Sequence, residues 1–544
     1  MNHTNNYFFY CQKYIENDIE TNKFYSEIYN KFNFVCNQEK TPIYLLNKVL
    51  SKTNIYSDDV EEILKDIVVV VSTNWNILIL HNNLDRDKIE YFYDEFLDDI
   101  YSIVDRFNFT NSKCLGRKRE WKDLIKIETW DNQIDLDNFS IDTISKRKIK
   151  VLLSLIIDSI NDAEKICSYS DNLSKLQKIK TRIKIFDAEQ TRFLYNEPKK
   201  ATTPEVITIQ GLSGSGKTEL LLHKIKNIFE NETDKKVALV CHSKILANKL
   251  ENRIEDFFDY MGIRNRRNWQ DRIFVSHAWG GLYKKICSFY QIPFLSYGKE
   301  SNFDKVCQKA IENLSTTIHT MYDYLLIDES QDLPESFFEL CKIVTSKKVY
   351  IVGDIFQDIY GNKIRTLTEV DFTLKECYRT NPRTLMMAQA VGLGLFEDKQ
   401  IDCLEKSEWQ SCGYDIVKND DYKYTLKRDD IRIFEEEESI KDSFEIIVTQ
   451  RKITDIIKKL KTILERLKSD YSDIKNGDIA IIVMFKNRQS TYTIINHVKV
   501  LLSQMGVDFN ISYEEGTHYE NKLFITNQNN VKGLEFPFVI CLWI

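Results

Sequence analysis

The chain has 544 residues, a formal net charge of −7 and 43% hydrophobic residues. This length allows about three or four domains, and the negative charge excludes a chain that is basic overall, so a nucleic-acid partner would have to meet a local basic groove. The 12 cysteines include no C-x-x-C pair, which indicates reduced cysteines rather than a disulfide framework or a zinc site. The sequence has neither a signal-peptide pattern nor an apolar run long enough to span a membrane, and we expect a soluble, cytoplasmic protein without membrane contact.

Residues 1–180 are predicted to be mostly helical. Acidic and apolar residues alternate at helical spacing over residues 88–107 and 142–166. Between these segments, residues 67–71 and 77–80 are apolar runs typical of two strands. The region contains no catalytic motif, and its role stays open.

From residue 181 to 395 the pattern changes to alternating strands and helices. Short apolar strands, each followed by helical or loop sequence, are expected at 206–209, 237–240, 273–275, 324–327 and 349–352. This alternation predicts a parallel sheet with helices on both faces. A further α/β region follows, with strands expected near 479–483 and 538–542.

The first strand of this alternation runs into a glycine-rich segment that fits the pattern G-x-x-x-x-G-K-[ST]. Its members are Gly211, Leu212, Ser213, Gly214, Ser215, Gly216, Lys217 and Thr218. Glycines in such a loop let backbone N–H groups surround phosphate oxygens, and the following helix adds the partial positive charge of its N-terminus. Lys217 would reach the β- and γ-phosphates, and the Thr218 hydroxyl would bind Mg²⁺. The segment therefore predicts a nucleoside triphosphate site.

A second motif, residues 325–332, is an apolar strand that ends in Asp328 and Glu329. Because the carboxyl ends of parallel strands share one edge of a sheet, both carboxylates are expected beside the phosphate loop. Asp328 would hold Mg²⁺ through water, while Glu329 would orient and deprotonate the attacking water.

The segment Asp-Glu-Ser-Gln-Asp at 328–332 is similar to motif II of the UvrD/Rep type of superfamily 1 DNA helicases. Further motifs that resemble those of this family follow in order, and the resemblance covers residues 181–544. It implies an α/β fold with tandem RecA-like P-loop NTPase domains, residues 181–395 and 396–544, after a mostly helical N-terminal region. It also implies ATP and Mg²⁺ as cofactors.

The same resemblance assigns nucleotide contacts outside the two motifs. Gln190, in a segment that resembles the Q motif, would read the adenine edge, and Glu535 would bond the ribose. Gln357 would sense the γ-phosphate, and Arg379 would stabilise the charge that develops on it. With the lysine and the glutamate of the two motifs, these last two residues complete the expected catalytic set.

Five residues match positions that contact nucleic acid in this family: Ser243, Ser276, His277, Tyr360 and Lys532. By resemblance, Tyr360 would face the single strand and stack on it. The serines and the lysine would contact its backbone, which makes the grip independent of sequence. Single-stranded DNA is the expected partner, and RNA is not excluded.

Two departures from the family pattern affect the expected activity. About 45 residues separate His277 from Tyr324, too few for the large accessory subdomains of typical members, so translocation is better supported than duplex separation. Motif VI, which supplies a second arginine, does not follow motif V. Either the sequence is a truncated product or a protein partner completes the site; in both cases we expect ATP binding with slow hydrolysis.

Two functions of different classes remain. The first is an ATP-dependent translocase or helicase on single-stranded DNA, for which the resemblance implies 3′ to 5′ movement in DNA repair or in defence against foreign DNA. The second is an ATP-gated switch that controls residues 1–180 or a partner protein. Stimulation of ATP hydrolysis by single-stranded DNA, with movement along it, would distinguish them.

Overall fold

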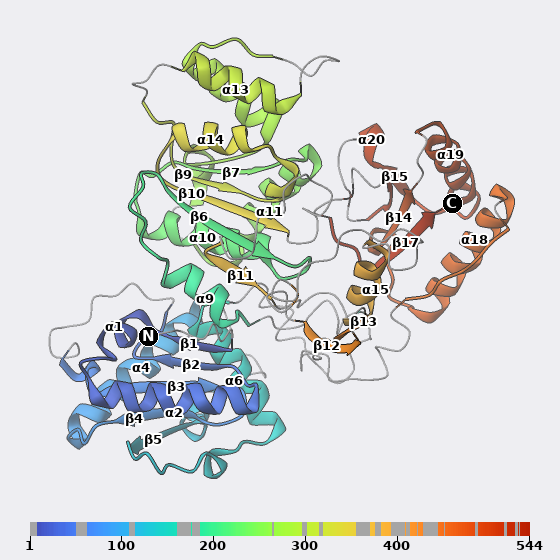
Figure 1. Ribbon diagram of the computed structural model, residues 1–544. Helices are drawn as coiled ribbons and strands as arrows, with labels where there is room; N and C mark the ends of the chain where they lie inside the picture. The colour runs from blue at the N-terminus through green and yellow to red at the C-terminus, as the bar shows by residue number, and fades with distance from the viewer. Residues whose placement is uncertain are drawn as a thin grey trace.

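The structure is a computed structural model, and its described residues form several layered sheets (Figure 1). They are residues 8–50, 62–107, 115–159, 176, 185–263, 266–295, 302–314, 319–354, 370–375, 382–392, 409, 414–420, 423–427, 444–450, 452–484, 488–515, 519, 521–527, 531 and 534–543. Within this part of the chain there are sheets of five, six, two and four strands. No helix within these ranges is long and apolar enough to cross a membrane.

The first sheet is mixed and belongs to the N-terminal region. Its strands, in spatial order, are β1 (Phe9–Cys11), β2 (Ile43–Leu46), β3 (Ile67–Ser72), β4 (Ile77–His81) and β5 (Ile125–Thr129). β3 is antiparallel to both of its neighbours, whereas the two outer pairs are parallel. One face packs against α2, and the other packs against α4 and α6. The helices are α1 (Lys13–Asp18), α2 (Lys23–Glu39), α4 (Arg86–Arg106), α5 (Lys118–Trp121), α6 (Thr143–Ile156) and the 3-10 turns Lys122–Leu124 and Leu136–Phe139.

The described part of this region contains the expected helices, but they pack around a five-stranded sheet, so it is a mixed helical and sheet region instead of a mostly helical one. The two predicted strands are present as β3 and β4. The sheet is nevertheless larger than expected, because it also contains β1, β2 and β5, which the sequence analysis missed. These strands are only three to five residues long, and runs this short give a weak periodic signal. α4 coincides with the first predicted helix, but α6 ends at Ile156, before the expected residue 166.

The central sheet is parallel, as the sequence predicted, but it has six strands instead of the five expected, because β11 (Phe372–Leu374) was not recognised. In spatial order the strands are β11, β6 (Glu205–Gly211), β10 (Thr345–Asp354), β9 (Tyr322–Ile327), β7 (Val237–Cys241) and β8 (Ile273–His277). Every neighbouring pair is parallel. All their carboxyl ends therefore lie at one edge, where open α/β sheets bind ligands.

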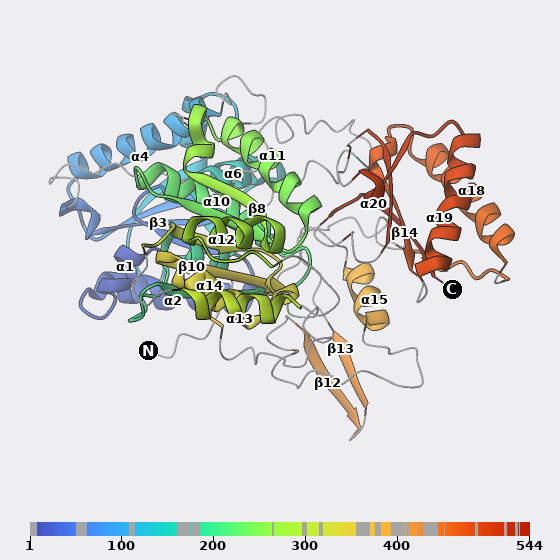
Figure 2. The ribbon, with the colours of Figure 1, turned by 90° about the horizontal axis from the view of Figure 1, so that it is seen from above.

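Helices pack on both faces of the central sheet, so its strands are buried on both sides (Figures 1 and 2). One face carries α9 (Ala188–Tyr195), α10 (Lys217–Asn231) and α11 (Lys244–Tyr260). The other carries α12 (Lys284–Tyr290), α13 (Phe303–Asn313) and α14 (Glu335–Ile343). The shorter turns are the 3-10 helices Arg266–Asp271 and Ser330–Asp332 and the π-helix Ala278–Tyr283.

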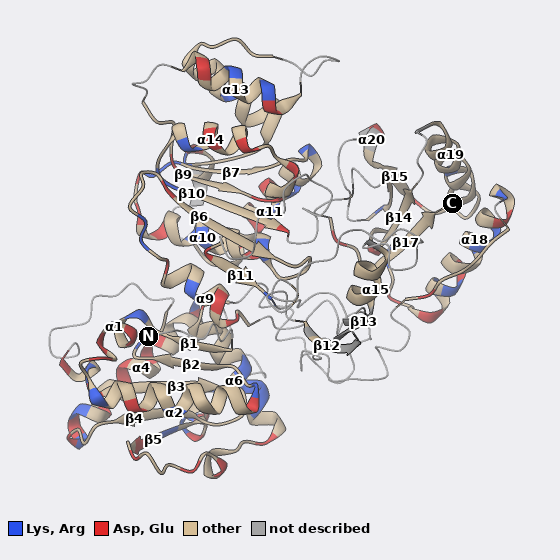
Figure 3. Cartoon of the chain, in the orientation of Figure 1, with Lys and Arg blue, Asp and Glu red and all other residues tan. Residues whose placement is uncertain are grey.

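A second parallel sheet follows, in the order β15 (Phe509–Ile511), β16 (Leu523–Asn527), β14 (Ile479–Met484) and β17 (Phe538–Trp543). α18 (Ile453–Asp470) and α19 (Arg488–Gln504) pack on one of its faces, and both strands predicted here are present. Also in this part are α15 (Pro382–Gly392), α20 (Ser512–Glu515), the 3-10 turn Asn476–Asp478 and the hairpin of β12 (Asp415–Asp420) and β13 (Lys423–Lys427). Figure 3 shows that the strands carry few charges, which lie mainly on the helices with both signs interspersed.

The N-terminal sheet and the central sheet share one hydrophobic core. Polar contacts at α9 reinforce the junction. The Tyr44 hydroxyl donates a hydrogen bond to the carbonyl of Phe186, just before α9. The Arg192 guanidinium donates one to the Phe9 carbonyl at 2.6 Å, and the Asn196 amide donates one to the Cys11 carbonyl at 3.1 Å. The N-terminal region is therefore packed against the central sheet as one body.

A buried ion pair also crosses this junction. The ammonium of Lys226, on α10, pairs with the carboxylate of Asp158, which follows α6, and both side chains are at most 5% exposed. The Tyr195 hydroxyl donates to the same carboxylate at 3.4 Å. Loss of either partner should lower the stability of the protein, because a buried charge without its counter-ion has a high free energy.

Asp158→Asn should lower the free energy of unfolding by about 3–5 kcal/mol, because it removes the buried counter-charge of Lys226 and leaves only the more exposed Glu230. Asparagine is a suited probe, since residue 158 has a left-handed backbone, φ 56°, which asparagine tolerates. The control is Glu230→Ala. Glu230 also pairs with Lys226, at 3.7 Å, but is 33% exposed, so its loss should cost less than about 1 kcal/mol. Equal effects of the two variants in urea unfolding would contradict the role given to Asp158.

Candidate nucleotide-binding site

The glycine-rich loop lies between the carboxyl end of β6 and the first turn of α10, as predicted. Gly214 and Gly216 have φ of 79° and 86°, conformations that favour glycine. Gly211 is required for a different reason, because a Cβ there would lie 2.6 Å from the Ser215 hydroxyl oxygen and 2.9 Å from the Cβ of Leu374. The loop thus folds tightly at the start of a helix, the geometry that binds phosphate.

Lys217 lies inside this loop, with its side chain 8% exposed. Its ammonium donates hydrogen bonds to the carbonyls of Gly211 and Leu212, both at 3.0 Å. The third contact is an ion pair with the Asp354 carboxylate at 3.2 Å. An ammonium has three N–H donors, and all three of these contacts are with the protein.

Thr218 and Asp328 meet at the same edge of the sheet. The Thr218 hydroxyl donates a hydrogen bond to the Asp328 carboxylate at 2.7 Å, and Asp328 is fully buried at the end of β9. Burial raises the pKa of Asp328, against the opposing effects of Thr218 and Lys217. A hydroxyl and a carboxylate this close are ligands of the kind that Mg²⁺ takes beside phosphates, so these residues fit the expected metal.

Another buried polar group in the loop fits a phosphate ligand. The Ser215 hydroxyl is completely buried, and within the described residues it has no hydrogen-bond partner. Buried hydroxyls in proteins are normally paired. A phosphate oxygen held by the loop would supply an acceptor.

Glu329 follows Asp328 in a left-handed backbone conformation, φ 54°, which is unusual for a residue with a side chain. Burial and the neighbouring Asp328 raise the pKa of Glu329 to about 7. The Gln331 amide donates a hydrogen bond to its carboxylate at 2.6 Å. A carboxylate with a pKa near neutrality, held in a defined orientation, is suited to accept a proton from water.

Gln190 lies beside the loop at the start of α9. Its amide oxygen accepts from the backbone N–H of Asp187 at 3.0 Å, and its amide nitrogen donates to the Ser215 carbonyl at 2.8 Å. Asp187 in turn caps α9 by accepting from the backbone N–H of Gln190. Gln190 thus ties α9 to the phosphate loop, while its contact with adenine stays a prediction.

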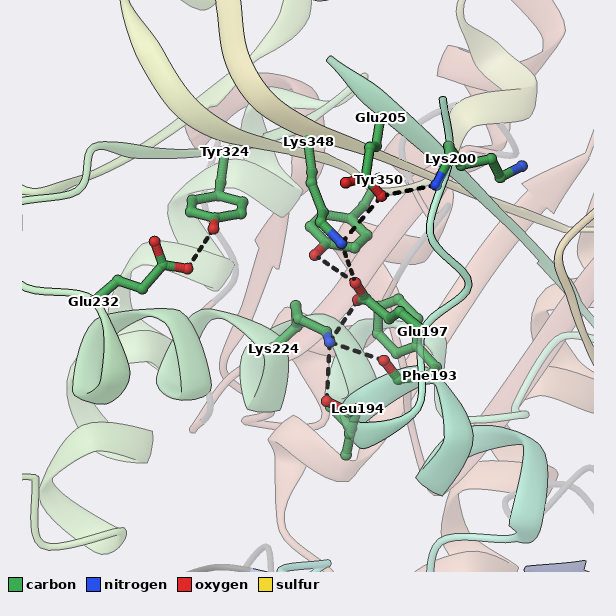
Figure 4. A network of polar contacts seen from close by, with 10 residues as sticks. All are labelled: Phe193, Leu194, Glu197, Lys200, Glu205, Lys224, Glu232, Tyr324, Lys348 and Tyr350. Atoms are coloured by element: carbon green, nitrogen blue, oxygen red, sulfur yellow. Dashed lines mark hydrogen bonds and ion pairs between the residues drawn. The ribbon is translucent and has the colours of Figure 1, made fainter. Parts of the chain in front are cut away.

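The far half of α10 is fixed by the network in Figure 4. The Lys224 ammonium donates to the carbonyls of Phe193 and Leu194, at 2.8 and 3.1 Å, and pairs with Glu197 at 2.6 Å. Glu197 also pairs with Lys348, on β10, at 2.9 Å. Burial disfavours the charged form of Glu197, but the two lysines outweigh it and lower its pKa. The helix that carries Lys217 is therefore held against α9 and β10.

The predicted nucleic-acid residues fall into two groups. Ser243, Ser276 and His277 lie at the carboxyl ends of β7 and β8, with His277 paired to Cys241 in the register. Ser243 caps α11 by accepting from a backbone N–H. Burial, with Lys244 and His242 nearby, lowers the pKa of His277. The structure therefore brings these three residues to the same sheet edge as the loop.

The remaining predicted residues are not placed at the site. Gln357, Tyr360, Arg379 and Lys532 lie outside the described residues. Glu535 is described and exposed, just before β17. Their roles stay predictions.

The sequence analysis gave no role to Asp354 and Gln331, which the structure places in the site. Asp354 pairs with Lys217, and its backbone N–H donates to the Gln331 amide oxygen at 3.0 Å. A signal was present for Asp354: like Asp328, it ends a predicted parallel strand. Only the register of β10 beside β6, which sets Asp354 opposite Gly211, shows that it reaches the lysine.

Three comparisons with known proteins gave one family match and several similar solved structures. Residues 197–363 match the family model described as an AAA domain. A search of curated proteins found no match. Similar solved structures include Saccharomyces cerevisiae Dbp5 bound to RNA and ADP-BeF3, with 10% identity, a TM-score of 0.28 and coverage of 67% of this chain and 76% of that one. A variant of the same protein bound to a Gle1 variant and IP6 has the same identity and TM-score, with 67% and 75% coverage.

The six-stranded parallel sheet, the phosphate loop and the family match define the class of this part of the chain. It is a P-loop NTPase domain, with the loop at 211–218.

Glu329→Gln should stabilise the nucleotide-free protein in a pH-dependent way. The raised pKa means that the folded state keeps a proton that the unfolded state releases between about 4.5 and 7, so stability falls as pH rises through that window. The glutamine amide does not ionise, so the variant avoids the free-energy cost of ionising a buried carboxyl in the folded state. The gain in free energy of unfolding should reach at most ~3 kcal/mol near about pH 8 and shrink below about 1 kcal/mol near about pH 5. A gain that is the same at both values in urea unfolding would contradict the raised pKa.

Proposed function

We propose that this chain is an ATP-dependent translocase or helicase that acts on single-stranded DNA. The observation that carries the proposal is the cluster at one sheet edge of Lys217, Thr218, Asp328 and Glu329, which has the composition of an ATP-hydrolysing site. We further propose residues 181–395 and 396–544 as its two RecA-like domains, with the nucleotide between them. The resemblance to UvrD/Rep-type helicases supports the choice of DNA as the partner.

Each residue of the cluster has a separate task in hydrolysis. Lys217 would exchange its contacts in the loop for the β- and γ-phosphates, and Thr218 and Asp328 would hold Mg²⁺. The metal, when bound, neutralises charge on the phosphates. Glu329 orients the attacking water and accepts its proton at the carboxylate oxygen. Gln357 and Arg379 act on the γ-phosphate from the segments that follow β10 and β11, and Glu535 bonds the ribose from the second domain.

The proposed DNA path crosses the carboxyl ends of β7 and β8. Ser243, Ser276 and His277 lie there, at the edge that also holds the nucleotide. Lys244 adds a positive charge close to His277. Single strands are bound without sequence preference by backbone contacts together with stacking. Lys532 is a further candidate for backbone contact, and Tyr360 is the candidate for stacking.

One observation favours the second function, an ATP-gated switch that controls the N-terminal region or a partner protein. α9 contacts the phosphate loop through Gln190 at one end and the N-terminal strand β1 through Arg192 and Asn196 at the other. A change in the loop on nucleotide binding could therefore be transmitted to the N-terminal sheet. Such a switch would need no DNA.

Glu329→Gln should keep Mg²⁺·ATP affinity and lose hydrolysis by on the order of 10²–10⁴-fold, because an amide cannot accept a proton. Lys217→Ala is the matched variant that should lose nucleotide binding itself, since the lysine contacts phosphate. Binding is measured with a fluorescent ATP analogue and hydrolysis by phosphate release. Normal turnover by Glu329→Gln would remove Glu329 from the mechanism.

Single-stranded DNA should raise the rate of ATP hydrolysis, because the proposed DNA path and the nucleotide share one sheet edge. The rate is measured with DNA, with RNA of the same sequence and with neither, and movement is followed by displacement of a protein bound at the strand end. A rate that no nucleic acid changes, together with altered proteolytic protection of the N-terminal sheet on ATP binding, would favour the switch.

A further inference from the structure

The ion pair between Lys217 and Asp354 is the feature of the site that the expected catalytic residues leave unexplained. Asp354 ends β10 directly beside Gly211 on β6. Its side chain is 4% exposed, and that of Lys217 is 8% exposed. Ion pairs buried to this degree are strong only when both partners are satisfied, and here the two loop carbonyls complete the shell of the lysine.

The lysine cannot keep these contacts and also bind phosphate. An ammonium has three donors, and the three contacts within the loop and with Asp354 use the same number. A nucleotide that reaches the loop therefore competes with Asp354 for Lys217. It also brings negative phosphates close to a carboxylate that remains buried.

We propose that Asp354 is a positioning residue, a counter-ion that holds Lys217 in the empty site and competes with the nucleotide for it. The inference rests on the proposed function, because it requires that the loop bind a nucleotide. When phosphate leaves, Asp354 takes the lysine back, which weakens the hold on the remaining diphosphate. Asp354 thereby favours product release.

Gln331 connects this competition to the water-activating carboxylate. Its amide oxygen accepts from the Asp354 backbone N–H at 3.0 Å, and its amide nitrogen donates to Glu329 at 2.6 Å. Gly353 permits this close packing, since a Cβ there would lie 2.6 Å from the Ser330 hydroxyl oxygen. Gln331 therefore links the end of β10 to Glu329, so a shift of Asp354 on losing the lysine would reach the water-activating carboxylate.

The test is the affinity of the full chain for a fluorescent ADP in the wild type and in Asp354→Asn. The amide keeps the shape of the carboxylate and removes its charge. Because it is a weaker acceptor for Lys217 and does not repel phosphate, it should tighten ADP binding by about tenfold or more. Stopped-flow displacement should show that the gain arises mainly from slower release. If Asp354 had a purely structural role, its substitution would weaken ADP binding, since a disturbed loop binds phosphate less well.

The control is Asp323→Asn, at the start of β9. This carboxylate is also partly buried and paired, with Lys235 at 3.3 Å, but lies at the opposite edge of the same sheet. Its ADP affinity should equal that of the wild type. Unchanged or weaker binding by Asp354→Asn would overturn the inference while leaving the nucleotide site intact. Absence of binding by both the wild type and Asp354→Asn would overturn the proposed function as well.

Discussion

The position of α10 is the constraint on which the nucleotide site depends. Its first residue, Lys217, must face the loop, and the loop follows directly from β6. Lys224 and Lys226 fix the rest of the helix through buried contacts with Glu197 and Asp158. Lysine is rarely buried without a partner, so each contact specifies one orientation of the helix. The phosphate loop is consequently built on a helix that its surroundings hold on two sides.

Electrostatics in the site balance one cation against several carboxylates. Asp328, Glu329 and Asp354 lie near Lys217, and burial raises the pKa of the first two. An arrangement of this kind is unfavourable for the empty protein and suited to a nucleotide that arrives with a divalent cation. The pKa of about 7 for Glu329 reflects this environment in two ways. Burial and the neighbouring carboxylate lower the stability of the empty protein, and they also make the Glu329 carboxylate a stronger base. Active sites commonly combine these properties.

Local patterns predicted the parts of the fold that depend on local sequence. The phosphate loop, the Asp-Glu strand end and five of the six strands of the parallel sheet were predicted, because glycine spacing and apolar runs determine them. β1, β2 and β5 were missed because strands of three to five residues carry only a weak periodic signal. The partnership of Asp354 with Lys217 requires the register of β10 against β6, which joins residues 137 positions apart. Gln190 was assigned to adenine by resemblance alone, and its contact with the Ser215 carbonyl could not be inferred from spacing.

The shared core has a mechanical consequence for a motor of two domains. Nucleotide-driven closure requires one body to move against another. The N-terminal sheet, α9 and the central sheet are joined by one hydrophobic core and by the Lys226–Asp158 pair, so they move together, whereas the second parallel sheet has its own core. In the proposed motor, closure on ATP would therefore occur between this composite body and the second sheet. The N-terminal region would then move together with the phosphate loop, and so would a partner bound to that region.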